Sequence, residues 1–159
     1  MTATVLRMYE LDRPEMCSIG RAMEILGERW TFLILREAFY GVRRFSDMQR
    51  NLGIARNILS GRLQNLVRAG ILERRRYQEE PERFEYRLTQ AGRDLYPAVV
   101  AIMRWGDEYL TGTAPVELHH CCGEVADPKL VCGHCSEPLH PHHVTPVPGP
   151  GAQEPLAAG

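Results

Sequence analysis

The stretch RNILSGRLQNLVRAGILERRRYQEEPERFEYRLT, residues 56–89, decides the fold, because a helical period and a strand period follow each other within it. Its first part, Arg56 to Ala69, carries apolar side chains at the i, i+4, i+7 and i+8 positions of one helical stripe. These side chains are Leu59, Leu63, Leu66 and Val67. Gly70 ends the pattern, so we expect an amphipathic helix over 56–69.

The second part of this stretch has the pattern of a β-hairpin. Ile71 to Tyr77 and Phe84 to Leu88 are strand-like runs on either side of the turn-rich segment 78–83. In the second run, apolar and charged residues alternate, with Phe84, Tyr86 and Leu88 on one face and Glu85 and Arg87 on the other. This pattern predicts a half-buried hairpin packed against helices, which is called a wing.

Three helices are predicted before this stretch, over Ser18–Leu26, over Trp30–Tyr40 and from Ser46 to Leu52. Ser46 stands where an N-cap hydroxyl should accept backbone N–H bonds, and Gly53 ends the third helix. A short turn containing glycine joins that helix to the helix over 56–69. Two helices joined in this way have the sequence shape of a helix-turn-helix.

A last helix is predicted to follow the hairpin, with Thr89 as its cap. It carries many apolar side chains: Leu95, Val99, Ile102, Met103, Trp105, Tyr109 and Leu110. The terminal helix of a small monomer cannot readily bury so much apolar surface. We therefore predict that this helix forms the interface of a homodimer.

Composition divides the chain near Thr111-Gly112-Thr113. Residues 1–110 hold 18 Arg against 15 acidic residues, a net charge of +3, and the remainder holds only Lys129 against five acidic residues, a net charge of −4. The remainder also holds all six His, eight of the 11 Pro and four of the five Cys. This composition indicates a Pro-rich segment with a possible metal site, not a second apolar core.

The N-terminal residues do not resemble a secretion signal. Arg7, Glu10, Asp12 and Arg13 stand where a signal peptide needs an apolar segment, and no run of about 18 apolar residues occurs in the chain. We therefore expect a cytoplasmic protein.

With these elements in place, the residues from Cys17 to Leu110 resemble the HxlR family of winged-helix transcriptional regulators. The resemblance rests on Cys17 and on short motifs that lie in the helices, the turns and the hairpin. The motifs are Gly27-Glu28-Arg29-Trp30, Gly41-Val42-Arg43-Arg44-Phe45, Ile54-Ala55-Arg56-Asn57-Ile58-Leu59-Ser60, Arg62-Leu63 with Leu66, Gly70-Ile71-Leu72, and Pro81 through Tyr86-Arg87-Leu88-Thr89 to Gly92. Most of these residues determine the fold.

The resemblance implies a homodimer on a palindromic promoter site, with the helix over 56–69 in the major groove and the wing beside the minor groove. On a helical wheel, the face opposite the leucines then supplies the base-reading side chains, with Gly61 permitting close approach. The predicted base-reading residues are Arg56, Asn57, Ser60 and Gln64. Arg43, Arg44 and Ser46 are predicted to hold phosphates, and Arg83 to enter or border the minor groove.

Other arginines are ambiguous on sequence grounds. Arg62 and Arg68 are as compatible with a solvated or ion-paired role as with DNA contact. In the Arg74-Arg75-Arg76 run, strand alternation separates Arg75 from its neighbours, and Glu79, Glu80 and Glu82 are available to neutralise the charge. We assign none of these arginines to DNA.

Cys17 falls where several members of the family carry a thiol that senses electrophiles or oxidants. A thiol beside a helix N-terminus can have a lowered pKa and so become reactive. Met16 and Ile19 favour the alternative, in which Cys17 is a small buried apolar side chain. Cys17 is therefore a candidate redox sensor, with a small electrophile or oxidant as the signal.

The tail carries two short cysteine motifs, His119-His120-Cys121-Cys122-Gly123 and Cys132-Gly133-His134-Cys135. Each motif can present two ligands from one tight turn, and thiolates with imidazole suit tetrahedral zinc. The predicted set is His119, Cys122, Cys132 and Cys135, with His120, Cys121 and His134 as rival ligands. Nine residues separate Cys122 from Cys132, fewer than the roughly 15 to 20 of the usual four-cysteine pattern. A reduced unstructured tail and a reversible disulfide such as Cys132 with Cys135 remain alternatives.

The predicted fold is thus mainly α with a small β-hairpin wing, a winged helix-turn-helix over residues 1–110, followed by a zinc-ribbon-like extension over 111–145 and a disordered tail over 146–159. The predicted function is sequence-specific, ligand- or redox-responsive regulation of transcription. A closed four-ligand zinc site leaves no position for water, so we predict no enzyme. The alternatives are a protein-interaction module and a catalytic zinc protein with Glu124 or Glu137 as general base.

Overall fold

The structure is a computed structural model and describes residues 17–147 and 149–150. It divides into two compact units, residues 25–126 and the described residues of the ranges 1–24 and 127–159. The predictions about the N-terminal charges at 7–13 and about most of the disordered tail fall outside the described residues. No described helix has the length and apolar character that crossing a membrane requires.

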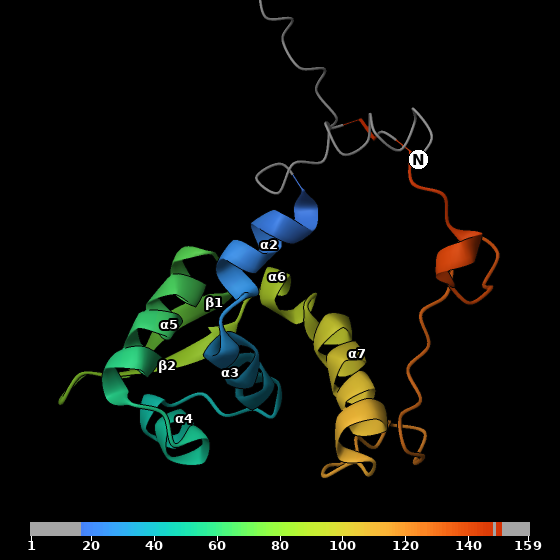
Figure 1. The fold of residues 1–159 in the computed structure, drawn as a ribbon. Helices are drawn as coiled ribbons and strands as arrows, with labels where there is room; N and C mark the ends of the chain where they lie inside the picture. The colour runs from blue at the N-terminus through green and yellow to red at the C-terminus, as the bar shows by residue number, and fades with distance from the viewer. Residues whose placement is uncertain (1–16, 148, 151–159) are drawn as a thin grey trace, which may run out of the picture. The chain divides into compact units, whose positions relative to one another are not determined.

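The first described helix, α2, spans Ser18–Leu26 as predicted, and most of the remaining secondary structure belongs to the unit 25–126 (Figure 1). Its elements are α3 (Arg29–Phe39), α4 (Phe45–Leu52), α5 (Arg56–Arg68), β1 (Leu72–Gln78), β2 (Arg83–Leu88), α6 (Gln90–Arg93), α7 (Tyr96–Gly106) and a short π-helical turn over Asp107–Thr111. Figure 1 shows α3, α4 and α5 gathered around the β1–β2 hairpin, with α7 beside α3.

The core of this unit forms where α3, α4 and α5 meet the base of the hairpin. Its largest fully buried apolar side chains come from each of these elements: Ile34, Leu35, Met48, Leu59, Leu63, Leu66 and Leu72. The leucine stripe that predicts the helix over 56–69 is therefore the face that α5 buries. A side chain of this kind contributes roughly 1.5–3 kcal/mol when it is fully buried.

The helix-turn-helix is made by α4 and α5. Gly53 ends α4 with φ of 61°, a left-handed conformation that glycine adopts at little cost, and its N–H donates to the Gln49 carbonyl at 3.0 Å. Ile54 follows and is buried. The turn thus fixes where α5 begins relative to α4.

The wing is an antiparallel pair in which Leu72 lies opposite Leu88 and Arg76 opposite Phe84, with an irregularity between Arg76 and Gln78. A third segment extends it, because the Tyr86 N–H donates to the Arg43 carbonyl at 2.8 Å. The loop before α4 is therefore held by the wing.

Three sequence predictions about these elements were wrong in detail. Ser46 is not an N-cap, because α4 begins at Phe45 with Arg44 as its cap residue. The last helix is two helices, since Thr89 caps the short α6 and α7 then starts anew with Pro97 in its first turn, where the missing proline N–H costs nothing. The two faces of β2 do not divide into buried and solvated, because all residues from Phe84 to Leu88 are half-buried.

Candidate nucleic-acid interface

The exposed face of α5 carries the residues predicted to read bases. Arg56, Asn57, Gly61 and Gln64 are exposed and Ser60 is half-buried, while the leucine stripe on the other side of the helix is buried. The structure therefore brings the predicted residues together on one outward surface of a helix whose inner face anchors it. This surface, defined by Arg56, Asn57, Ser60, Gly61 and Gln64, is called the reading face below.

Gly61 lies in the middle of α5, where glycine weakens a helix. A Cβ added there would meet no atom within 4 Å. Nothing in the packing of the protein itself therefore requires glycine at this position. The open space would let another molecule approach the helix backbone closely at this point.

The predicted phosphate contacts lie beside a polar hollow of about 480 Å³ next to α4. Arg43, Arg44 and Arg50 line it, and Ser46 is exposed in the first turn of α4. Arg50 lies one turn after Ser46 on α4 and was not among the predicted contacts. Its guanidinium pairs with Asp47 at 2.8 Å.

Among the described residues, two of the five arginines that the sequence left ambiguous form ion pairs, Arg62 and Arg76, and the other three, Arg68, Arg74 and Arg75, do not. Arg62 pairs with Glu28 at 2.9 Å, and Arg76 lies 3.5 Å from both Glu79 and Glu82. By contrast, no described residue forms an ion pair with the predicted DNA contacts Arg43, Arg44, Arg56 and Arg83. Arg44 and Arg56 instead stack on the rings of Tyr77 and Phe45. Stacking leaves the donors of a guanidinium able to meet a phosphate.

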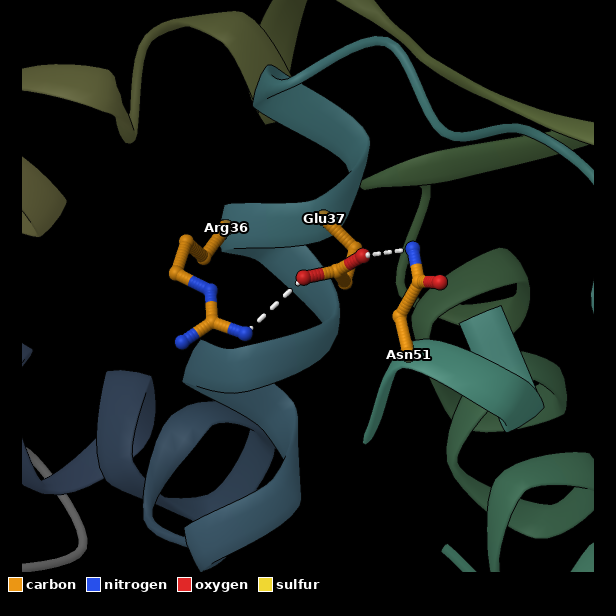
Figure 2. A network of polar contacts seen from close by, with 3 residues as sticks. All are labelled: Arg36, Glu37 and Asn51. Atoms are coloured by element: carbon orange, nitrogen blue, oxygen red, sulfur yellow. Dashed lines mark hydrogen bonds and ion pairs between the residues drawn. The ribbon is translucent and has the colours of Figure 1, made fainter. Parts of the chain in front are cut away.

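A buried carboxylate links α3 to the helix-turn-helix (Figure 2). Glu37 is 5% exposed, and its two oxygens accept from Arg36 Nη2 at 2.8 Å and from Asn51 Nδ2 at 2.7 Å. Figure 2 shows Arg36 and Asn51 on opposite sides of this carboxylate. Sequence reasoning missed this network, because Glu37 and Asn51 belong to different helices and are 14 residues apart in the sequence.

The apolar surface predicted for dimerisation lies along α7 and the π-helical turn after it. Ile102, Trp105, Tyr109 and Leu110 are 51%, 55%, 64% and 72% exposed. The rings of Trp105 and Tyr109 lie 5.8 Å apart. This cluster is called the α7 patch below.

The first cysteine motif forms a small hairpin over residues 118–126. The Ala126 N–H donates to the Leu118 carbonyl at 2.7 Å, and Gly123 turns the chain with φ of 95°. In this hairpin His120 Nδ1 lies 3.2 Å from the Cys122 sulfur.

The second motif forms a similar hairpin, over 130–139, within the other unit. The Leu139 N–H donates to the Leu130 carbonyl at 3.0 Å, and the Cys132 N–H donates to the Glu137 carbonyl at 2.9 Å. Backbone N–H groups of His134 and then Cys135 hydrogen-bond the Cys132 sulfur and lower the pKa of that thiol. Among the described residues, no three His, Cys, Asp or Glu side chains are gathered as a metal site.

Cys17 is half-buried and immediately precedes α2, where its carbonyl accepts from the Arg21 N–H at 2.9 Å. It therefore lies at the helix N-terminus that the sequence predicts. Its thiol is free, as are those of the other four cysteines.

Comparison with known proteins gives a consistent result for the helix-turn-helix region. Residues 25–114 match the family model described as HxlR-like helix-turn-helix. An uncharacterized HTH-type transcriptional regulator of Mycobacterium tuberculosis is 58% identical over 144 residues, which cover 89% of this chain and 91% of the relative.

Solved structures show the same likeness. The crystal structure of the transcription factor candidate PA1607 has 36% identity and a TM-score of 0.73, with 82% of this chain and 94% of that chain covered. The redox regulator HypR in its oxidized form has 29% identity and a TM-score of 0.54, with 58% of this chain and 96% of that chain covered.

Proposed function

Since this chain belongs to the HxlR-like helix-turn-helix family, we propose that it binds a palindromic promoter site as a homodimer and regulates transcription in response to a signal. The family model is described as HxlR-like helix-turn-helix and the relative as an HTH-type transcriptional regulator, so the chain is a winged-helix transcriptional regulator and not an enzyme. Because we propose double-stranded DNA as its partner, we expect it to act in the cytoplasm.

The observation that supports specific DNA binding is the reading face of α5. It presents Asn57 and Gln64, whose amides can bond an adenine edge in two places, and Arg56, whose guanidinium can do the same with guanine. Arg43, Arg44 and Ser46 would hold the phosphates beside it, and Arg83 would meet the minor groove.

The salt dependence of binding tests this arrangement. If Arg43, Arg44 and Arg83 each neutralise one phosphate in both subunits, log K should fall with log salt with a slope of about −5, a roughly thousand-fold loss between 50 and 200 mM. Fluorescence anisotropy with a labelled 30-base-pair duplex measures the slope. Replacing Arg43 and Arg44 by Ala should reduce it, whereas Arg62→Ala should not, because Arg62 is paired with Glu28. A flat salt response in the wild type would contradict DNA binding.

We propose the α7 patch as the dimer contact, because four large apolar side chains there are more than half exposed. Trp105→Glu should give a monomer in sedimentation equilibrium and weaken binding to duplex DNA. Leu130→Glu, a change at a leucine that is 74% exposed in the other unit, should leave the dimer intact. A dimer that persists in Trp105→Glu would refute this contact.

We further propose that zinc binds through His119, Cys122, Cys132 and Cys135. The support is the spacing of the two motifs and the hairpin that each one forms by itself. Zinc would order the tail and supply no open position for chemistry.

Metal analysis tests this proposal. Protein purified without chelators should hold one zinc per chain, and Cys132→Ser should lose it while Cys17→Ser keeps it. Separate His119→Ala and His120→Ala variants identify the imidazole ligand. Both must be compared, because His120 lies in contact with Cys122 and is the rival of His119. A full zinc content in Cys132→Ser would overturn the assignment.

For the signal, we propose that oxidants or electrophiles act on Cys17. Its place at the start of α2 supports the idea, as does the likeness to HypR, which is described as a redox regulator. Diamide, quinones or aldehydes should release the wild type from DNA and leave Cys17→Ser bound. Equal release from both proteins would exclude this thiol as the sensor.

A further inference from the structure

The wing and the loop before α4 meet at a stacked pair of side chains, Tyr77 and Arg44. The Arg44 guanidinium lies over the Tyr77 ring, 4.9 Å from its centroid. The backbone of the same loop is held by the other strand of the wing. The Tyr86 N–H donates to the Arg43 carbonyl at 2.8 Å, and Arg44 forms a β-bridge with Glu85. Arg44 is therefore held through its backbone by β2 and through its side chain by β1.

Tyr77 has an irregular place in the hairpin. Arg76 lies opposite Phe84 on β2, and Gln78 lies opposite Arg83, the neighbour of Phe84. Tyr77 therefore has no partner on β2 and forms a β-bulge, an irregularity that re-aims a side chain. Its side chain is 38% exposed, so it adds little to the apolar core. The ring can therefore be changed without dismantling the domain.

The charge of Arg44 is available to an anion. Two carboxylates line the polar hollow beside α4, and each is engaged by another arginine. Asp47 pairs with Arg50 at 2.8 Å, and Glu85 pairs with Arg87 at 2.7 Å. No described residue forms an ion pair with Arg44 itself. Because stacking occupies the face of a guanidinium, the N–H donors at its edge stay able to bond a phosphate.

We propose that Tyr77 is a positioning residue for DNA binding, whose ring holds the Arg44 guanidinium at the hollow, ready for a backbone phosphate. This inference rests on the proposed function, since the phosphate belongs to the bound duplex. An arginine side chain that moves freely in solution loses rotamer freedom on binding, and one already held by a ring loses less. Tyr77 should thus raise the affinity for every duplex alike, without reading a base.

Two substitutions separate the ring of Tyr77 from its hydroxyl. Tyr77→Leu removes the ring and keeps an apolar side chain, whereas Tyr77→Phe removes the hydroxyl alone. A cation–π contact at an exposed site changes an equilibrium by about two- to five-fold. Tyr77→Leu should therefore raise the Kd for a labelled 30-base-pair duplex by about that factor per subunit, and Tyr77→Phe should bind like the wild type. If Tyr77→Phe binds as weakly as Tyr77→Leu, the hydroxyl is the group that matters and positioning by the ring is refuted.

A double-mutant cycle separates positioning from a general loosening of the wing. In an Arg44→Ala background, Tyr77→Leu should have no further effect on the Kd, because the side chain that the ring holds is gone. Phe84→Leu is the matched control, since Phe84 lies in the same hairpin and its ring contacts Arg74, which we do not assign to DNA. It should leave the Kd unchanged. Equal losses in Phe84→Leu and Tyr77→Leu, or an undiminished effect of Tyr77→Leu in the Arg44→Ala background, would overturn the proposal.

The contact itself is measured on the full chain without DNA. In NMR spectra, the ring current of Tyr77 should shift the side-chain signals of Arg44 in the wild type and in Tyr77→Phe, but not in Tyr77→Leu. Unshifted Arg44 signals in the wild type would refute the contact. Wild-type protein that binds no duplex would refute the proposed function, and this inference with it. If the wild type binds and Tyr77→Leu binds equally well, this inference alone is refuted.

Discussion

Substituting Gly61 by alanine should have opposite effects on folding and on DNA binding. Gly61 is an interior position of α5, and a Cβ there would meet no protein atom within 4 Å. Alanine is favoured over glycine in a helix interior by about 0.8–1 kcal/mol, and no clash offsets this gain. The free energy of unfolding should therefore rise by roughly 0.5–1 kcal/mol.

The same methyl group would project from the reading face toward the DNA. If the duplex approaches α5 as closely as we propose, the methyl group should hold the helix away from the DNA. The affinity for duplex DNA should then fall at least about ten-fold, which corresponds to roughly 1.4 kcal/mol. Urea unfolding followed by circular dichroism measures the first effect, and anisotropy with a bound duplex measures the second. Unchanged or tighter DNA binding by Gly61→Ala would refute close approach at this face.

Three further predictions concern folding and phosphate contact. Glu37→Gln should lower the free energy of unfolding by about 1.5–3 kcal/mol, because a buried charge-assisted hydrogen bond is lost. Glu79→Gln, at an exposed ion pair, should change it by less than about 1 kcal/mol. Equal effects of the two substitutions in urea unfolding would contradict the buried network. Gly92→Ala should destabilise the domain by roughly 1–3 kcal/mol, because its Cβ would collide with the Ile71 backbone oxygen, and a wild-type unfolding midpoint would contradict that packing. Arg83→Ala should weaken binding to every duplex alike and reduce the salt slope by about 0.9 for each lost phosphate contact, while altered sequence preference would show that Arg83 reads bases instead.

The fold could be predicted from local patterns where one period dominates. The leucine stripe specifies α5, because it buries one face of one helical period. The two runs of the hairpin were also located correctly, although their alternation does not divide β2 into a buried and a solvated face. The break before α7 was missed, although Pro97 stands at the point where a new helix begins. The apolar residues before and after Pro97 follow the same helical period, so the pattern alone does not reveal that one helix ends and another begins.

The site could be predicted in part. Exposure of the reading face follows from the same stripe that predicts α5, since the side opposite a buried stripe must face outward. The link from Glu37 to Asn51 could not be predicted, because it depends on how α3 and α4 pack. Likewise, only the fold shows which arginines have acidic partners, as Arg62 does in Glu28.

Selection of bound duplexes from a random library tests the central claim, that α5 reads a specific DNA sequence, most directly. Wild-type protein should enrich a palindrome, and a variant with Asn57→Ala and Gln64→Ala should bind DNA with the same salt slope but enrich nothing. If the reduced, metal-loaded wild type enriches no sequence, or if the double variant enriches the same palindrome, α5 is not the element that specifies the site.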